Sequence, residues 1–466
     1  MNELNQDLYR HHKDILWNYW LLIILGGWMV LFPLTFSYGA AMVEPAGGRD
    51  IWLTADARVI AMALSDMISG LLLMLFGWRA LRPNRPVSVW ICCLVGVWLN
   101  LAPILFWAPN AVAYVNSTII GVLAITFSVI IPDIPNITHF KKPGTSIPSA
   151  WSYNPSSLPQ RSVMMFLAFC GWVISRYLGA YQLGYTEVAW DPFFGQGTRE
   201  VLESDLSESW PVSDGAFGGF AYTMEFLLVW LGGSLRWRVM PWTVIFFGIL
   251  VIPLGLVHIF LVISQPVTVG AWCTLCLLAA AIMMPMIALA VDEVAATLQH
   301  LVQSVRNGAS FGQVFWKGGD PEKRQTGEQI PEMIDFPNQP GRVLQAACRG
   351  MSFSVTLSLA AVLGAWLVIA PDIFGVGIEA TAAGINHLAG ALIVVVSVIS
   401  MAEVIRGARY ANILPALIVA VAPWFAPDGS QELYLNGAVT GMFIILLSIP
   451  KGYIHETYGM WDKYIR

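Results

Sequence analysis

Residues 271 to 291 read AWCTLCLLAAAIMMPMIALAV, a run without a single charged side chain. In a helix that rises 1.5 Å per residue, about 20 residues cross the roughly 30 Å hydrocarbon core of a bilayer. Hydrocarbon offers no water to backbone polar groups, so such a run has to be helical. We therefore predict a membrane helix that opens with two cysteines, Cys273 and Cys276, one helical turn apart.

The whole chain has the same character. Of its 466 residues, 56% are apolar and only 12% are charged, whereas a soluble domain carries about one-quarter charged residues. Further apolar runs of similar length occur at 17–38, 58–78, 87–107, 112–132, 163–185, 216–233, 241–263, 353–374, 380–405, 414–427 and 433–450. The sequence predicts an all-α polytopic membrane protein in contact with lipid, with about 12 transmembrane helices in three four-helix blocks. The basic residues are scattered, so no nucleic-acid partner is expected.

Polar connections divide these blocks. We expect a first membrane domain at 1–140, a central bundle at 160–305 and a last membrane domain at 351–466, with a cytoplasmic linker at 306–350. Within the central bundle, a long outer loop covers 186–214. The inner side of a membrane protein holds the excess of Lys and Arg. When successive connections between the helices alternate between the inner and outer sides, starting inside, nearly all Lys and Arg residues fall on the inner side. Both termini are therefore predicted to be cytoplasmic, with Cys273 and Cys276 at the outer surface.

The first and last blocks share a repeated pattern. A Trp-x4-Pro unit occurs at Trp28–Pro33, Trp98–Pro103 and Trp366–Pro371, and a polar residue followed by glycine recurs as Asn116-x4-Gly121 and Asn436-x4-Gly441. Small residues at such positions let membrane helices approach closely. The pattern resembles the SPW-repeat membrane family, with two helices per repeat. The resemblance implies a pair of four-helix flanking domains over 17–132 and 353–450.

Cys273 and Cys276 are the one cysteine pair with redox spacing. The N-terminus of a helix stabilises negative charge, so we expect Cys273 to be the more acidic, exchange-competent thiol and Cys276 to lie deeper. Residue 277 is Leu, not the His of a haem-attachment motif, and no second pair with zinc spacing shares the helix face. No metal site is therefore expected. A purely structural role for the two cysteines remains an alternative.

The surrounding residues resemble the vitamin K epoxide reductase family over about 162–300. The resemblance rests on Trp272, Cys273 and Cys276 at the start of the last bundle helix and on the outer-loop sequence DPFFG at 191–195. It implies a four-helix bundle that holds a quinone beside Cys276, while Cys273 exchanges with a second thiol pair. It also implies a bacterial inner membrane with a periplasmic outer face.

The chain departs from that family in one respect. The family relays electrons through a cysteine pair in the outer loop, and residues 186–214 contain no cysteine. Either an extracytoplasmic thiol protein reaches Cys273 directly, or the exchange function is lost and the chain is a non-catalytic scaffold or an accessory subunit of a membrane complex. A transporter is a third possible class of function. Transporters of this size typically have broken helices at matching positions of their two halves.

Several other residues are candidates for the site. By helix depth, Arg176 and Glu225 are expected to form a buried ion pair, either functional or simply an interhelical clamp. With Trp272, the expected quinone-binding residues are His258, Phe193 and Phe194. His258 would donate a proton to a reduced quinone oxygen, or else it is an ordinary core histidine. The two phenylalanines would cap the bundle mouth and line the quinone entrance.

Overall fold

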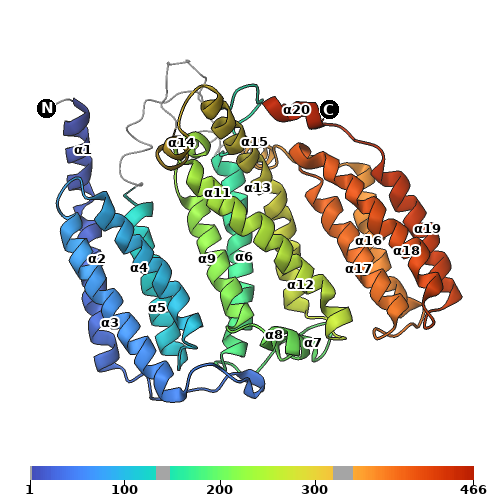
Figure 1. Cartoon of the computed structure of the whole chain (residues 1–466), viewed down its shortest axis with the longest axis horizontal. Coiled ribbons are helices and arrows are strands. Elements are labelled where there is room, and N and C mark those ends of the chain that lie inside the picture. Colours follow the sequence, from blue (N-terminus) through green and yellow to red (C-terminus); the bar gives the residue numbers. More distant parts are fainter. Residues whose placement is uncertain (1–2, 133–146, 319–338, 466) are drawn as a thin grey trace. The chain divides into compact units, whose positions relative to one another are not determined.

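The structure is a computed structural model of the chain that describes residues 3–132, 147–318 and 339–465. Its regular elements in these segments are helices, which confirms the all-α class (Figure 1). The predicted membrane helices are all present: α2 (Leu16–Thr35), α3 (Ala55–Ala80), α4 (Pro86–Leu105), α5 (Ala111–Ile125), α6 (Leu158–Gln182), α9 (Asp214–Trp230), α11 (Pro241–Ile249) with α12 (Gly255–Thr268), α13 (Thr274–Arg306), α16 (Val355–Ile373), α17 (Thr381–Ile399), α18 (Ile413–Val421) and α19 (Gln431–Ser448). The predicted 306–350 linker and the 1–140 domain extend partly outside the described residues.

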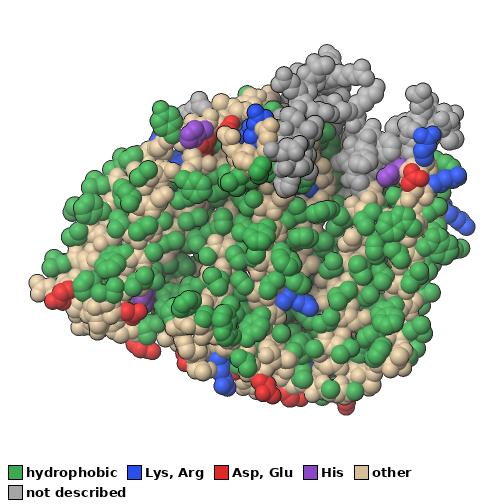
Figure 2. All heavy atoms as spheres, turned by 180° about the vertical axis from the view of Figure 1, so that it is seen from behind, with side chains coloured by type: hydrophobic (Ala, Val, Ile, Leu, Met, Phe, Trp, Pro, Cys, Tyr) green, Lys and Arg blue, Asp and Glu red, His purple; other side chains and the backbone are tan. Residues whose placement is uncertain are grey.

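The membrane assignment is confirmed, but the predicted count of about 12 spans is not. Of the helical stretches in the described ranges, 10 are long and apolar enough to cross a membrane. Helix α9, with 17 residues, and helix α19, with 18, are not among them. Hydrophobic side chains dominate the face shown in Figure 2, where charged side chains are few. Such a surface suits contact with lipid.

The chain forms two compact units. Among the described residues, the first unit comprises 3–132, 169–189 and 202–233. The second comprises 147–168, 190–201, 234–318 and 339–465. The boundary falls within α6, whose first residues belong to the second unit and whose remainder belongs to the first. Each unit is described by itself below.

In the first unit, helices α2 to α5 pack through glycines. A Cβ atom on Gly26 would lie 2.6 Å from the carbonyl oxygen of Gly70, and one on Gly96 would lie 2.7 Å from that of Gly121. Backbones this close leave no room for a side chain, as in other close-packed membrane helix pairs. The glycine of the sequence pattern, Gly121, is therefore a contact point between helices, and so is Gly70.

In both units, the tryptophan and the asparagine of the repeated sequence pattern form a hydrogen bond with each other. In the first, Trp28 Nε1 donates to Asn116 Oδ1 at 2.9 Å. In the second, Trp366 Nε1 donates to Asn436 Oδ1 at the same 2.9 Å. An interhelical hydrogen bond in hydrocarbon contributes about 0.6 kcal/mol on average. The two flanking blocks thus share an internal clamp, which gives the sequence repeat a structural cause.

In the second unit, α16 to α19 lie side by side (Figure 1). The buried Arg236 makes a two-pronged ion pair with Glu293 of α13, at 2.6 Å for both the Nε–Oε1 and the Nη2–Oε2 contacts. Pro253, which cannot donate a backbone hydrogen bond, falls in a π-helical turn (Leu250–Leu254) between α11 and α12. Helix α13 continues through Pro285 to Arg306, beyond the predicted run of 271–291.

Two adjacent glycines of α2 test the close packing. We expect Gly26→Ala to lower stability by about 1–3 kcal/mol, because its methyl group meets the α3 backbone. A methyl group on Gly27 would have no neighbouring atom within 4 Å, so Gly27→Ala should be neutral or stabilise the helix by up to about 1 kcal/mol. Thermal unfolding of the purified full chain in detergent measures both. Equal midpoints for the two variants would contradict the close contact.

Candidate redox site at the start of helix α13

The two cysteines of the motif form a disulfide at the first turn of α13. Cys273 is the N-cap residue and has an extended backbone, and its Cα lies 5.2 Å from that of Cys276. Its Sγ accepts a hydrogen bond from the Cys276 amide at 3.1 Å, while its own amide donates to Gln265 Oε1 at 3.2 Å. The i, i+3 spacing on a helix brings the two side chains together, so the pairing follows from local geometry.

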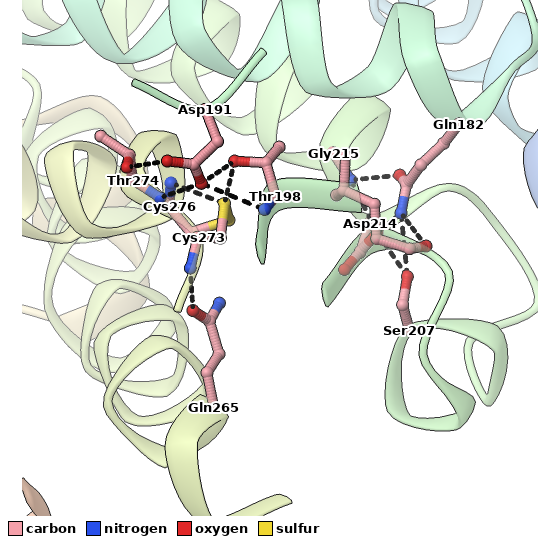
Figure 3. The surroundings of a disulfide bond; sticks show 11 residues. Gln182, Asp191, Thr198, Ser207, Asp214, Gly215, Gln265, Cys273, Thr274 and Cys276 are labelled. Carbon is pink, nitrogen blue, oxygen red and sulfur yellow. Dashed lines mark hydrogen bonds between the residues drawn. A yellow bond between two sulfur atoms is a disulfide. The ribbon is translucent and has the colours of Figure 1, made fainter. Parts of the chain in front are cut away.

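A carboxylate from the α6–α9 connection binds the same helix terminus. Asp191 Oδ1 accepts from the amides of Phe193 and Phe194 at 3.1 and 2.9 Å, and from the Thr274 hydroxyl at 2.5 Å. Its Oδ2 accepts from the Thr198 amide and hydroxyl at 3.1 and 2.7 Å, and from the Thr274 amide at 3.2 Å. Asp191 therefore ties its own loop to the first residue of α13 (Figure 3).

These contacts fix the charge state of Asp191. Burial alone raises the pKa of a carboxyl, but hydrogen bonds from the Thr274 hydroxyl and the Phe194 amide hold the pKa of Asp191 well below its ordinary value. The pKa of an aspartate carboxyl in the unfolded chain is about 3.9. The folding stability that these hydrogen bonds add is therefore complete above that pH and declines as the pH falls below it. The loop therefore stays attached over the whole neutral range.

The attached loop covers Cys273. The Thr198 hydroxyl lies 3.6 Å from Cys273 Sγ, and a Cβ on Gly197 would overlap the Trp272 carbonyl oxygen. Cys273 is 0% exposed and Cys276 is 8% exposed. The cysteine predicted to meet a partner is thus the more deeply covered of the two. The start of α7 (Gly197–Leu202) is the segment that covers it.

A residue of the last block also contacts the motif. The rings of Trp272 and His387, the latter from α17, lie 5.6 Å apart in an edge-to-face arrangement. His387 is 1% exposed, and its Nδ1 has no hydrogen-bond partner within the described part of the chain. Sequence reasoning did not find His387, because nothing local links α17 to residue 272. It also overlooked Asp191, although an aspartate before a Pro-Phe-Phe-Gly turn is a recognisable signal for a side chain that accepts nearby amides.

The predicted quinone-binding residues lie on different elements, and their role stays a prediction. Phe193 and Phe194 are 80% and 44% exposed, and their amides donate hydrogen bonds to Asp191. His258 lies on α12, and its buried Nε2 has no hydrogen-bond partner among the residues that the structure describes. Trp272 directly precedes Cys273 in the chain.

The predicted ion pair between Arg176 and Glu225 is wrong. Arg176 Nη1 donates to Thr118 Oγ1 at 3.3 Å, and its guanidinium lies 4.4 Å from the centre of the Tyr114 ring. The buried Oε2 of Glu225 has no hydrogen-bond partner in the described ranges. Arg176 lies beside Gly219 of α9, six residues before Glu225, and its side chain points towards α5, so the two side chains do not share a level in the bundle.

The rest of the α6–α9 connection is held within the first unit. Arg49 Nη2 donates to the carbonyl of Ser207 at 3.0 Å, and Trp107 Nε1 donates to that of Pro211 at 3.1 Å. Gln182 Nε2 donates to Ser207 Oγ at 2.8 Å and Gln182 Oε1 accepts from the Gly215 amide at 3.0 Å (Figure 3). The first block therefore anchors this part of the loop.

Within the described residues, ten apolar helices long enough to cross a membrane indicate an integral membrane protein, and one of them begins with a disulfide. Residues 162–291 match the vitamin K epoxide reductase family, and residues 355–450 match the SPW repeat domain. The chain therefore carries a vitamin K epoxide reductase family domain followed by an SPW repeat domain. That the first block is a further copy of the repeat stays a prediction, supported by its Trp28–Asn116 hydrogen bond. Comparisons with curated proteins and with solved structures found no match.

The cover over Cys273 can be tested by crosslinking. In a Cys276→Ala background, we expect Thr198→Cys to form a disulfide with Cys273, because the present side-chain atoms are 3.6 Å apart and a disulfide requires Cβ atoms about 3.8 Å apart. Peptide mass spectrometry without reductant detects the link. Glu200→Cys, on the exposed side of the same short helix, is the control and should remain unlinked. Equal crosslinking at both positions would show that the loop does not sit as described.

Proposed function

We propose that this protein is a membrane thiol oxidoreductase whose Cys273/Cys276 pair exchanges electrons with a quinone. The observation that carries the proposal is the disulfide on the first turn of α13, inside the segment that matches the vitamin K epoxide reductase family. A bond between cysteines at a helix N-terminus is typical of exchange-active pairs. The scattered cysteines elsewhere in the chain have no such spacing.

The electron balance of the proposed reaction is simple. Oxidation of the Cys273 and Cys276 thiols forms one S–S bond and releases two electrons and two protons, which a quinone takes up at its two oxygens. A dithiol of an extracytoplasmic protein then reduces the Cys273–Cys276 bond and is itself oxidised to a disulfide. Cys273 is the sulfur that the partner attacks, and Cys276 is the one nearer the quinone.

Residues of this chain fit such a ligand. The buried Nε2 of His258 has no hydrogen-bond partner in the described ranges, and an unpaired polar atom in an apolar setting is a natural contact for a quinone oxygen. Trp272 adjoins the pair, and the exposed Phe193 and Phe194 supply apolar contacts beside the loop. The charge distribution supports an outer-surface site and cytoplasmic termini. The family match supports a bacterial inner membrane.

One observation favours a second function. The loop places Thr198 against Cys273, where a family member would need a sulfur for internal relay, and Cys273 is fully buried. A chain that keeps the fold without exposing its thiol would serve as a scaffold or an accessory subunit of a membrane complex. The two functions differ in whether the redox state of the pair follows a quinone.

Differential thiol alkylation of membranes that contain the full chain makes this distinction. After mild reduction, we expect added quinone to return Cys273 and Cys276 to the disulfide within the assay, while the four other cysteines keep their labelling. Cys273→Ala and Cys276→Ala should each abolish the quinone-dependent change in the remaining partner, and Cys170→Ala is the matched control that should preserve it.

A pair that stays reduced at every quinone concentration, or that oxidises equally without quinone, would remove the oxidoreductase proposal in favour of the scaffold. A mixed disulfide trapped on Cys276→Ala would identify the thiol partner.

A further inference from the structure

The N-terminus of α13 has two candidate anions, and the structure gives one of them the better place. Asp191 accepts from the Thr274 amide and hydroxyl, whereas Cys273 Sγ accepts from the Cys276 amide and has the Thr198 hydroxyl at the longer distance of 3.6 Å. A helix N-terminus carries roughly half a positive charge, which ordinarily favours a thiolate on an N-cap cysteine. Here a side chain from a distant loop already occupies that terminus.

Asp191 has to be ionised in this arrangement. Four of its six contacts come from backbone amides, which can only donate, and the other two come from threonine hydroxyls, so this set of partners stabilises the carboxylate form. The Thr198 hydroxyl has one proton and lies 2.7 Å from the carboxylate but 3.6 Å from Cys273 Sγ. The Thr198 hydroxyl therefore donates its hydrogen bond to the carboxylate. A single hydroxyl group separates the Cys273 sulfur from the negative charge of Asp191.

We propose that Asp191 is a positioning residue for the redox pair: its fixed negative charge keeps reduced Cys273 in the thiol form, and its hydrogen bonds keep the loop closed over the sulfur. This inference rests on the proposed function, in which Cys273 is the exchanging sulfur. A negative charge nearby disfavours a second one, and burial disfavours a thiolate further. The closed state is therefore the unreactive state, and exchange requires release of the loop residues 191–198.

Other charged or titratable groups border the site. They are Arg199 and Glu200 of α7, Glu379, whose Oε1 lies 2.8 Å from a Cβ position on Gly270, and His387 against Trp272. Asp191 differs from them because it binds Thr274 and Thr198 directly. Its removal should therefore change Cys273 in a way that removal of Glu200 does not.

The test measures the alkylation rate of Cys273 against pH in the full chain, in a Cys276→Ala background, by peptide mass spectrometry. The midpoint of the profile reports the acidity of Cys273, and the plateau at high pH reports access to it. For Asp191→Asn we expect the midpoint to fall by about one pH unit or more. We expect its plateau rate to rise at least about tenfold, the effect of losing one hydrogen bond to a charged group.

Three further variants separate charge from attachment. Thr198→Val keeps the carboxylate, so its midpoint should not fall. Thr274→Val also keeps the charge but weakens the attachment, so its plateau rate should rise without a lower midpoint. Glu200→Gln should match the parent in both quantities.

The charge role is overturned if Asp191→Asn has the same midpoint as Glu200→Gln. The closed-loop role is overturned if Thr274→Val has the same plateau as Glu200→Gln, a comparison that stands even where Asp191→Asn does not fold. The Cys276→Ala chain cannot form the disulfide and the assay contains no quinone. A negative result here therefore leaves the proposed electron exchange to be decided separately, by the quinone-dependent redox state of the intact pair.

Discussion

Hydrocarbon offers no hydrogen-bond partner, so every segment within it must pair its own backbone groups, and helices do this everywhere except at their ends. The start of α13 is such an end. Three side chains accept hydrogen bonds from backbone N–H groups at or beside it. They are Cys273 through its sulfur, Asp191 through its carboxylate and Gln265 through its side-chain oxygen. The same unpaired amides that would otherwise destabilise the terminus therefore bring together the sulfur, the carboxylate and the covering loop. The chemistry of the site follows from satisfying a helix end.

Two parts of the α6–α9 connection are held by hydrogen bonds, each within its own unit. Residues 191–198 are attached to the start of α13 through Asp191, and residues 207–211 are attached to the first block through Arg49 and Trp107. In the second unit, α17 adds His387 against Trp272. The first block therefore anchors residues 207–211 of this connection, and the last block places a side chain beside the cysteine motif.

The two flanking blocks share their helix contacts but differ in one buried side chain. Both keep the tryptophan–asparagine hydrogen bond and the glycine contacts. The first buries Asp66, which accepts hydrogen bonds from Ser117 at 2.9 and 3.1 Å and from Tyr38. The last block has Asn386 at the matching position, and this side chain bonds to the Ala382 carbonyl of its own helix. The shared fold thus does not depend on the buried acid.

The sequence by itself determined the helices, since apolar length and Pro or Gly boundaries are local properties, and it determined the cysteine pair, since an i, i+3 spacing needs only one helical turn. It did not give the register between α6 and α9, since Arg176 lies beside Gly219, six residues before Glu225, and it did not give the direction of the Arg176 side chain, which faces Tyr114. Only the tertiary structure placed Asp191 on Thr274, 83 residues away, and His387 on Trp272. Position along a helix axis follows from counting residues, whereas rotation about that axis and the return of a loop are decided by packing between distant elements.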